Sequence, residues 1–229
     1  MVELISRNVC DSVKAPRKKK PKVEILSRDG ITAVLESLAG SQLYPIASLA
    51  LASGCRRGEL LALRWTDIEL GRGVVKVERA LEETKAGIRF KETKTEGGER
   101  SISLPASIVD VLVAHRKAQL ERRMKLGLGK PGACALVFCD DAGEPIGPNA
   151  LSVIWRRALA KHKLPVVTFH ALRHTHASAL IAAGVDVVAV SRRLGHSTPA
   201  FTLSVYAHLF DATKTDSVAA EAIAKMMST

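Results

Sequence analysis

The sequence predicts a mainly helical fold that contains one small three-stranded antiparallel sheet, an α+β class with most residues in helices. Two observations favour it. Apolar residues recur at helical spacing along most of the chain, and period-two alternation is confined to the stretch between residues 75 and 104. Apolar residues make up 47% of the 229, enough for a substantial core. Residues 1–26 lack these patterns, so we expect one folded domain over residues 27–229.

Three helices are predicted at the start of this domain. Ser27 suits the N-cap position of the first. Its buried face is indicated by apolar residues at i, i+3, i+4 and i+7, namely Ile31, Val34, Leu35 and Leu38. A second helix is expected over residues 43–53, where Gly54 ends it, and a third from Arg57 to Leu63.

The sheet is predicted from alternation of apolar and polar side chains. In residues 75–78 the two valines alternate with a lysine and a glutamate, and in residues 101–104 the apolar side chains alternate with serines. Residues 88–93 are expected to form the middle strand between these two, with Gly97 and Gly98 supplying a turn.

Helices fill the rest of the chain. A long helix is expected over residues 106–126 with four apolar residues on its buried face, Val109, Leu112, Val113 and Leu120. Further helices are expected at residues 148–162, 171–183, 186–193, 199–209 and 214–227. The last of these carries an apolar stripe at helical spacing, which could pack in the same subunit or on a neighbour: Val218, Ala222, Ile223 and Met226.

The charge balance indicates a polyanionic partner. The chain has 34 Lys and Arg against 23 Asp and Glu, a net charge of +11, and nucleic acid is the leading candidate. Aromatic residues are only 4% of the chain, so base stacking is not indicated and contact with a duplex backbone fits better. Residues 11–22 read as an extended linker that is either a solvated tail or a strap along DNA; its candidate DNA contacts are Arg17, Lys18, Lys19, Lys20 and Lys22.

The remaining composition favours a cytosolic protein. No apolar run approaches the roughly 18–20 residues of a membrane helix. The start of the chain also lacks the features of a signal peptide. The four cysteines are scattered without a CxxC pair, so we expect reduced thiols and neither disulfides nor a metal site.

Several short motifs carry groups that can bind an anion or move a proton. Arg56 and Arg57 stand at a loop-to-helix junction, where a guanidinium and helix N-terminal amides together suit a phosphate. Lys94 stands at a charged hairpin tip, where it could reach a substrate and donate a proton. His170 and Arg173 are at i, i+3 and therefore share a helix face.

Two metal-site interpretations compete with this one. His170 and His174 have the i, i+4 spacing of zinc helices, but no glutamate stands in the HExxH position and Arg173 would repel a cation. Asp140 and Asp141 could suggest a two-metal nuclease, yet the neighbouring glycine and proline favour a turn. We therefore expect no metal.

The ordered set of motifs resembles the catalytic domain of the tyrosine recombinases, the phage integrase family. The resemblance covers roughly residues 27–229 and consists of six positions in the family's order: Arg56, Lys94, His170, Arg173, His196 in Leu-Gly-His, and Tyr206 ten residues later. Glu59 stands where the family often has an acid that supports the site. The family's N-terminal core-binding domain is absent from this sequence, and residues 1–26 look like the tail of that domain followed by a basic linker.

The resemblance implies the DNA breaking-rejoining fold and site-specific recombination without a metal or a small-molecule cofactor. Tyr206 would attack the scissile phosphate and form a 3′-phosphotyrosyl intermediate. The two arginines would neutralise phosphate oxygens, and Lys94 would act as general acid. His170 would be a base or donor, and His196 a further donor. The implied partners are double-stranded attachment sites and a tetramer on DNA, although an isolated fragment could be monomeric. Alternatives are a type IB topoisomerase-like relaxase, a non-catalytic DNA-binding remnant and a metal-dependent nuclease.

Overall fold

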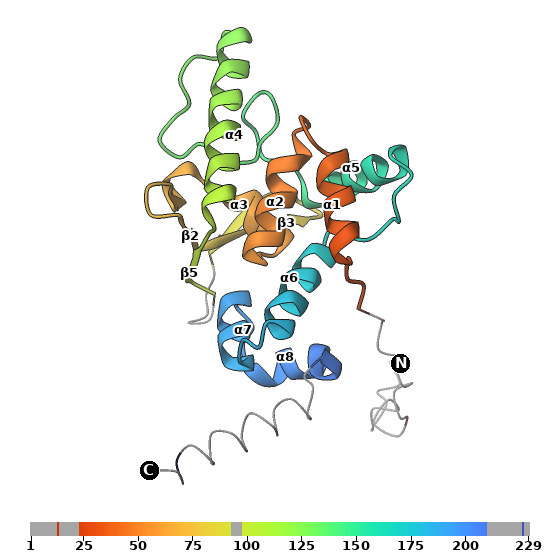
Figure 1. Ribbon diagram of the computed structural model, residues 1–229. Coiled ribbons are helices and arrows are strands. Elements are labelled where there is room, and N and C mark those ends of the chain that lie inside the picture. Colours follow the sequence, from red (N-terminus) through yellow and green to blue (C-terminus); the bar gives the residue numbers. More distant parts are fainter. Residues whose placement is uncertain (1–12, 14–22, 93–97, 210–225, 227–229) are drawn as a thin grey trace, which may run out of the picture.

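The computed structural model describes residues 13, 23–92, 98–209 and 226 (Figure 1). Helices dominate it, and two small antiparallel sheets lie between the third and fourth of them. The helices are α1 (Arg28–Ser37), α2 (Leu43–Ser53), α3 (Arg57–Ala62), α4 (Ala106–Lys125), α5 (Pro148–Lys161), α6 (Ala171–Ala182), α7 (Val187–Leu194) and α8 (Pro199–Tyr206), with 3-10 turns η2 (Trp65–Asp67) and η3 (Ala207–Leu209).

The first three helices match the prediction, and local chemistry fixes their ends. The Ser27 hydroxyl caps α1 by accepting a hydrogen bond from Gly30 N at 3.1 Å. Helix α2 lies in the core, and Gly54 ends it in the left-handed conformation, with φ of 67°. Only three residues therefore separate α2 from α3, which places Arg56 and Arg57 at a tight helix junction.

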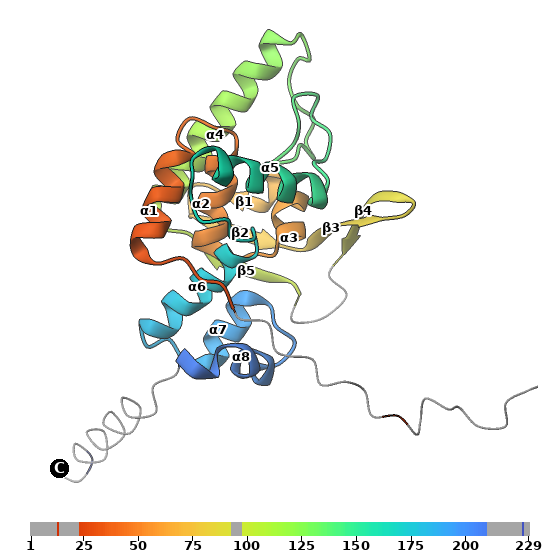
Figure 2. The ribbon, with the colours of Figure 1, turned by 90° about the vertical axis from the view of Figure 1, so that its right-hand side faces the viewer.

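The sheet prediction was wrong in its strand order. Strand β2 (Val74–Val77) pairs directly with β5 (Arg100–Ser103), and the short β1 (Ile68–Glu69) completes a three-stranded sheet in the order β1-β2-β5. The expected middle strand is instead β4 (Gly87–Glu92), which pairs with β3 (Arg79–Thr84) in a separate hairpin. The hairpin projects from the body (Figure 2), and all of β4 is exposed although Ile88 and Phe90 alternate with charged residues. Alternation therefore located this strand but not its partner.

The buried face of α4 also differs from the prediction. Leu112 is buried, but Val113 is 50% and Leu120 38% exposed. The buried polar side chains of α4 are His115 and Gln119. Both are hydrogen-bonded: the Gln119 amide accepts from Trp65 Nε1 at 2.7 Å, and His115 Nε2 donates to a backbone carbonyl. Apolar periodicity cannot find a helix face that is buried through satisfied polar groups.

The four helices predicted between residues 148 and 209 are present, and the last three of them enclose a second apolar cluster. The expected helix at 199–209 divides into α8 and the 3-10 turn η3, and the one at 214–227 lies outside the described residues apart from Met226. Figure 1 shows α7 and α8 gathered below α6, at the end opposite to the tip of α4. Their buried cluster consists of Ala177, Ile181, Val190, Leu194 and Tyr206, separate from the main core.

Residues 23–26 connect this second cluster to the start of the domain. Val23 packs against the cluster, and Leu26 N donates a hydrogen bond to Thr175 Oγ1 on α6 at 2.9 Å. Between them, Glu24 accepts a hydrogen bond from Thr168 N at 3.3 Å. In the described part of the chain, no helix is both long and apolar enough to cross a membrane.

Candidate active site

Arg56 and Glu59 are joined at the start of α3. The Arg56 backbone N–H donates to Glu59 Oε2 at 2.7 Å, and its guanidinium donates to Glu59 Oε1 at 2.8 Å and to Gly195 O at 2.7 Å. The guanidinium thus spans from α3 to the end of α7 while the side chain stays partly exposed. Glu59 lies where the sequence places an acid that supports the site.

Arg100, which was not among the residues predicted for the site, is the second partner of Glu59. Its Nη2 lies 2.7 Å from Glu59 Oε2, and its Nε donates to Arg193 O at 2.8 Å. Burial alone would raise the pKa of the Glu59 carboxyl, but the hydrogen bond and charge of Arg100, together with Arg56, outweigh it and lower that pKa. A signal was present, because Arg100 falls on the same strand face as the buried Ile102.

Arg173 lies deep in the site on α6. Its side chain is buried, with the residue 3% exposed, and Nη1 donates to Gly54 O at 2.6 Å. Burial, and then the nearby charge of Arg56, lowers the pKa of this guanidinium to about 10. Because the charge of Arg56 disfavours the charged form of Arg173, an anion bound near both would stabilise the site.

His170 and His196 belong to the same electrostatic neighbourhood. His170 is the N-cap residue of α6, and its surface is open to solvent on one side. Partial burial, followed by the charges of His174, Arg173 and Arg56, lowers the pKa of His170 to about 4. His196 follows the left-handed Gly195 at the end of α7, and its Nδ1 lies 2.8 Å from Thr202 Oγ1.

The pKa of His196 is affected by four other residues of the site, which shows that they lie close to it. Desolvation, then Arg173, Arg56, Arg100 and His170, lowers the pKa of His196 to about 4. Both imidazoles are consequently neutral at pH 7. A neutral imidazole can still donate one hydrogen bond to a phosphate oxygen without adding to the positive charge of the site.

Tyr206 is buried on α8 beside α6. The residue is 1% exposed, and its hydroxyl lies 2.6 Å from His174 Nδ1. Burial raises the pKa of Tyr206 to about 12, and Arg173 is the charge that opposes this rise. The sequence suggested His174 only as a zinc ligand, although its place one turn after His170 puts it on the same helix face.

His176 has a packing role on the other side of α6. Its Nδ1 donates to Leu51 O at 2.7 Å, and its Nε2 accepts from Arg193 Nε at 3.1 Å, so both ring nitrogens are engaged. The same ring packs against Gly54. The described residues contain no group of three or more His, Cys, Asp or Glu side chains that could hold a metal ion. The Asp140 carboxylate accepts bonds from Ala142 N and Glu144 N, so the turn predicted there is confirmed.

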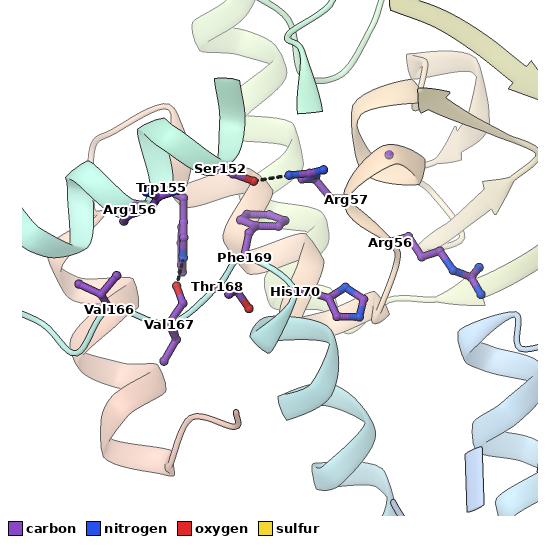
Figure 3. A pocket seen from close by; sticks show the side chains of 11 residues that line it. Arg56, Arg57, Ser152, Trp155, Arg156, Val166, Val167, Thr168, Phe169 and His170 are labelled. Atoms are coloured by element: carbon purple, nitrogen blue, oxygen red, sulfur yellow. Dashed lines mark hydrogen bonds between the residues drawn. The ribbon is translucent and has the colours of Figure 1, made fainter. Parts of the chain in front are cut away.

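An open cavity of about 580 Å³ adjoins the arginines (Figure 3). Figure 3 shows Arg57 hydrogen-bonded to the Ser152 hydroxyl on α5, while Arg56 points away toward α7. His170 and Arg156 also line the cavity, so its polar groups are cationic or neutral. The other candidate contacts predicted from the sequence, Lys94 and the basic residues of the 17–22 segment, lie outside the described residues.

The chain is similar to known proteins over most of its length. The model of the phage integrase family matches residues 29–213. A tyrosine recombinase XerC-like protein of Caldanaerobacter subterraneus is 30% identical over 93% of this chain and 59% of its own length. The ICEBs1 integrase of Bacillus subtilis is 25% identical over 91% of this chain and 56% of its own. The chain thus spans less than two thirds of these relatives.

Solved structures show the same fold. The Tn1549 transposon integrase, solved with transposon right end DNA, has a TM-score of 0.76 at 24% identity and covers 96% of this chain and 71% of its own. A lambda integrase dimer bound to a core site has a TM-score of 0.58 at 20% identity, over 90% of this chain and 65% of its own. With the family model covering most of the chain, and with Arg56, His170, Arg173, His196 and Tyr206 gathered at one site, this chain is a member of the phage integrase family of tyrosine recombinases.

Proposed function

We propose that this chain carries out site-specific DNA recombination by breaking and rejoining strands through a covalent bond to Tyr206, with residues 27–229 as the catalytic domain. The observation that supports this most directly is the grouping of two arginines and two neutral histidines beside a buried tyrosine. Related integrases have been solved with DNA, and the net charge of +11 suits the same partner.

In the proposed reaction the arginines bind the scissile phosphate. Charge on its non-bridging oxygens grows as the phosphorus becomes pentacoordinate, and preformed donors stabilise that state most. Arg56 and Arg173 supply guanidinium forks that match two oxygens, and Glu59 holds Arg56 in place. His170 and His196 are neutral and would donate one further hydrogen bond each.

The strand would then be cut without net loss of phosphoester bonds. Tyr206 Oη forms a bond to phosphorus as the bond to the 5′-oxygen breaks, giving a 3′-phosphotyrosyl linkage and a free 5′-hydroxyl. Lys94 would protonate the leaving 5′-oxygen. Because one phosphoester replaces another, the reverse attack by a 5′-hydroxyl of a partner strand reseals the DNA. No nucleotide, metal or other cofactor enters this scheme.

The wider assembly is part of the same proposal. Recombination joins two duplexes, so we propose a tetramer that acts on attachment sites in the cytosol or nucleoid, while the chain in isolation could be monomeric. The basic residues of the 17–22 segment and Arg57 would contact the DNA backbone, which positions a protein without reading sequence.

The test is covalent trapping in EDTA. The chain is incubated with a pool of nicked duplexes that carry a randomised core, and adducts that survive denaturation are isolated and sequenced. We expect an adduct that is lost in Tyr206→Phe, while retention of DNA in a mobility-shift assay is unchanged. An adduct that persists in Tyr206→Phe, or that requires a divalent metal, would overturn the proposal. Relaxation of a supercoiled plasmid without strand exchange would favour the relaxase alternative, and DNA binding without any adduct the non-catalytic one.

A further inference from the structure

The structure places an unassigned histidine directly on the proposed nucleophile. Among the described residues, His174 is the side chain that hydrogen-bonds the Tyr206 hydroxyl, through Nδ1 at 2.6 Å. The two rings meet edge to face, with centroids 5.7 Å apart. This distance is that of a strong hydrogen bond between a phenol and an imidazole nitrogen.

The other two histidines of the site are differently engaged. His196 Nδ1 contacts the Thr202 hydroxyl at 2.8 Å. The His170 ring packs edge to face on His174, with centroids 4.7 Å apart, at the open side of the site. His174 therefore lies between His170 and Tyr206 and is the one whose geometry suits proton exchange with the hydroxyl.

We propose that His174 is a catalytic residue that accepts the proton of Tyr206 as the tyrosine attacks, a role that rests on the recombinase function proposed above. In the resting state the phenol donates its hydrogen bond to the neutral Nδ1. On attack the Oη–H bond breaks and the proton passes to Nδ1, while the Oη–P bond forms and the P–O5′ bond breaks. The 5′-oxygen takes its proton from Lys94. Resealing reverses each transfer, so the imidazolium returns its proton to Tyr206.

The surroundings of His174 are consistent with an acceptor. Burial, and then the charge of Arg173, lowers the pKa of His174, with Glu24 acting in the opposite direction, so the ring is neutral near pH 7. The groups that face it are Tyr206 on α8, Glu24 in the preceding segment, and His170 and Arg173 on its own helix. A buried phenol cannot lose its proton to water directly, so a neighbouring base is needed.

The experiment measures adduct formation across pH with His174→Gln and the matched variant His170→Gln, one turn away on the same helix. It uses the trapped duplexes described above. At pH 7 we expect His174→Gln to slow the adduct on the order of a hundred-fold, the usual worth of a general base. The rate should then rise about tenfold per pH unit as hydroxide replaces the missing base, a slope that His170→Gln should not acquire.

A second substrate separates a base from an acid. If sulfur replaces the bridging 5′-oxygen of the scissile phosphate, the leaving group needs no proton. This substitution should rescue Lys94→Ala but not His174→Gln. A loss in His174→Gln that sulfur rescues, or that is equal at every pH, would overturn the role, and so would a rate within about threefold of wild type at pH 7, well below the effect of losing a general base.

A third variant guards against a purely structural loss. His174→Ala leaves a space beside the hydroxyl, and added imidazole should restore the adduct in a concentration-dependent way. Failure of imidazole to act in a folded, DNA-binding His174→Ala protein would count against proton transfer. If the wild-type chain itself formed no adduct, the recombinase function would fail first. If all three histidine variants formed adducts at the wild-type rate, the role of His174 would be disproved while the recombinase function would stand.

Discussion

The two halves of the site are built differently. On the arginine side, buried Glu59 accepts hydrogen bonds from Arg56 and Arg100, and Arg100 and Arg173 donate to the backbone carbonyls of Arg193 and Gly54. On the tyrosine side, the Tyr206 hydroxyl has one hydrogen bond within the described residues, to His174, and the Tyr206 ring is buried with four other apolar residues. The arginines are thus held by a network of hydrogen bonds and ion pairs, whereas the Tyr206 hydroxyl is positioned by a single hydrogen bond and by apolar packing.

The largest expected effect comes from removing the acid that holds the arginine side. Glu59→Ala would leave the buried Arg100 without its counter-charge, and we expect a loss of about 4 kcal/mol in the free energy of unfolding, since breaking a buried pair has a high cost. Urea unfolding measures it. Glu69→Ala, which removes an exposed ion pair with Lys76, is the control and should leave the midpoint nearly unchanged.

Lowering the pH should reduce the loss of unfolding free energy that Glu59→Ala causes. The folded-state pKa of Glu59 is lowered, so its contribution is present above the pKa of about 4.3 of an unfolded glutamate. It is lost as the pH falls through the lower folded value. A stability difference between wild type and Glu59→Ala that did not shrink on acidification would contradict the buried ion pair.

A smaller effect is expected where the two sides meet. Gly54, whose carbonyl binds Arg173, has a φ of 67°, and an added Cβ would lie 2.5 Å from His176 Cδ2. Gly40 has a similar φ of 74° but nothing within 4 Å, so Gly40→Ala isolates the backbone strain. We expect Gly54→Ala to destabilise by about 2 kcal/mol more than Gly40→Ala, the typical cost of overpacking. Thermal unfolding measures the difference. An equal loss of stability in the two variants would mean that the His176 ring moves aside without cost.

The smallest expected effect is on the tyrosine side, where the Tyr206 hydroxyl can be titrated. The chain has two tyrosines, so Tyr44→Phe leaves Tyr206 as the sole phenol, and its ionisation can be followed by absorbance. We expect a midpoint near the pKa of about 12 that burial gives Tyr206. Because the folded pKa is raised, this group stabilises the fold fully below pH of about 10 and loses that contribution as the pH rises toward the folded value. A midpoint near 10 would show that Tyr206 is solvated.

The sequence predicted the residues of the site better than their contacts. Arg56, His170, Arg173, His196 and Tyr206 lie near one another, as the resemblance to the tyrosine recombinases implies. The partner of the Tyr206 hydroxyl was not predicted, since the packing of α8 on α6 is not encoded in any local spacing. Arg100 was missed because charged residues around it suggested a solvated turn.

The fold was predictable to a similar degree. Helices with a cap or a terminating glycine, such as α1 and α2, were found within a few residues. The pairing of β4 with β3 and the polar buried face of α4 were not, because alternation does not identify the partner of a strand and hydrogen-bonded polar groups give no apolar signal. Both failures arise where hydrogen bonding and not apolar burial decides the structure.

The contacts of residues 23–26 have a consequence for how the protein can be cut and joined. Val23 packs on the cluster that contains Tyr206, and Leu26 is bonded to Thr175, next to His174. A version trimmed to begin at Ser27 would therefore remove neighbours of α6 although it keeps every helix that the structure describes. A tag, a fluorescent protein or a DNA-targeting module should therefore be joined before Val23, so that residues 23–26 keep their contacts with α6 and with the second apolar cluster.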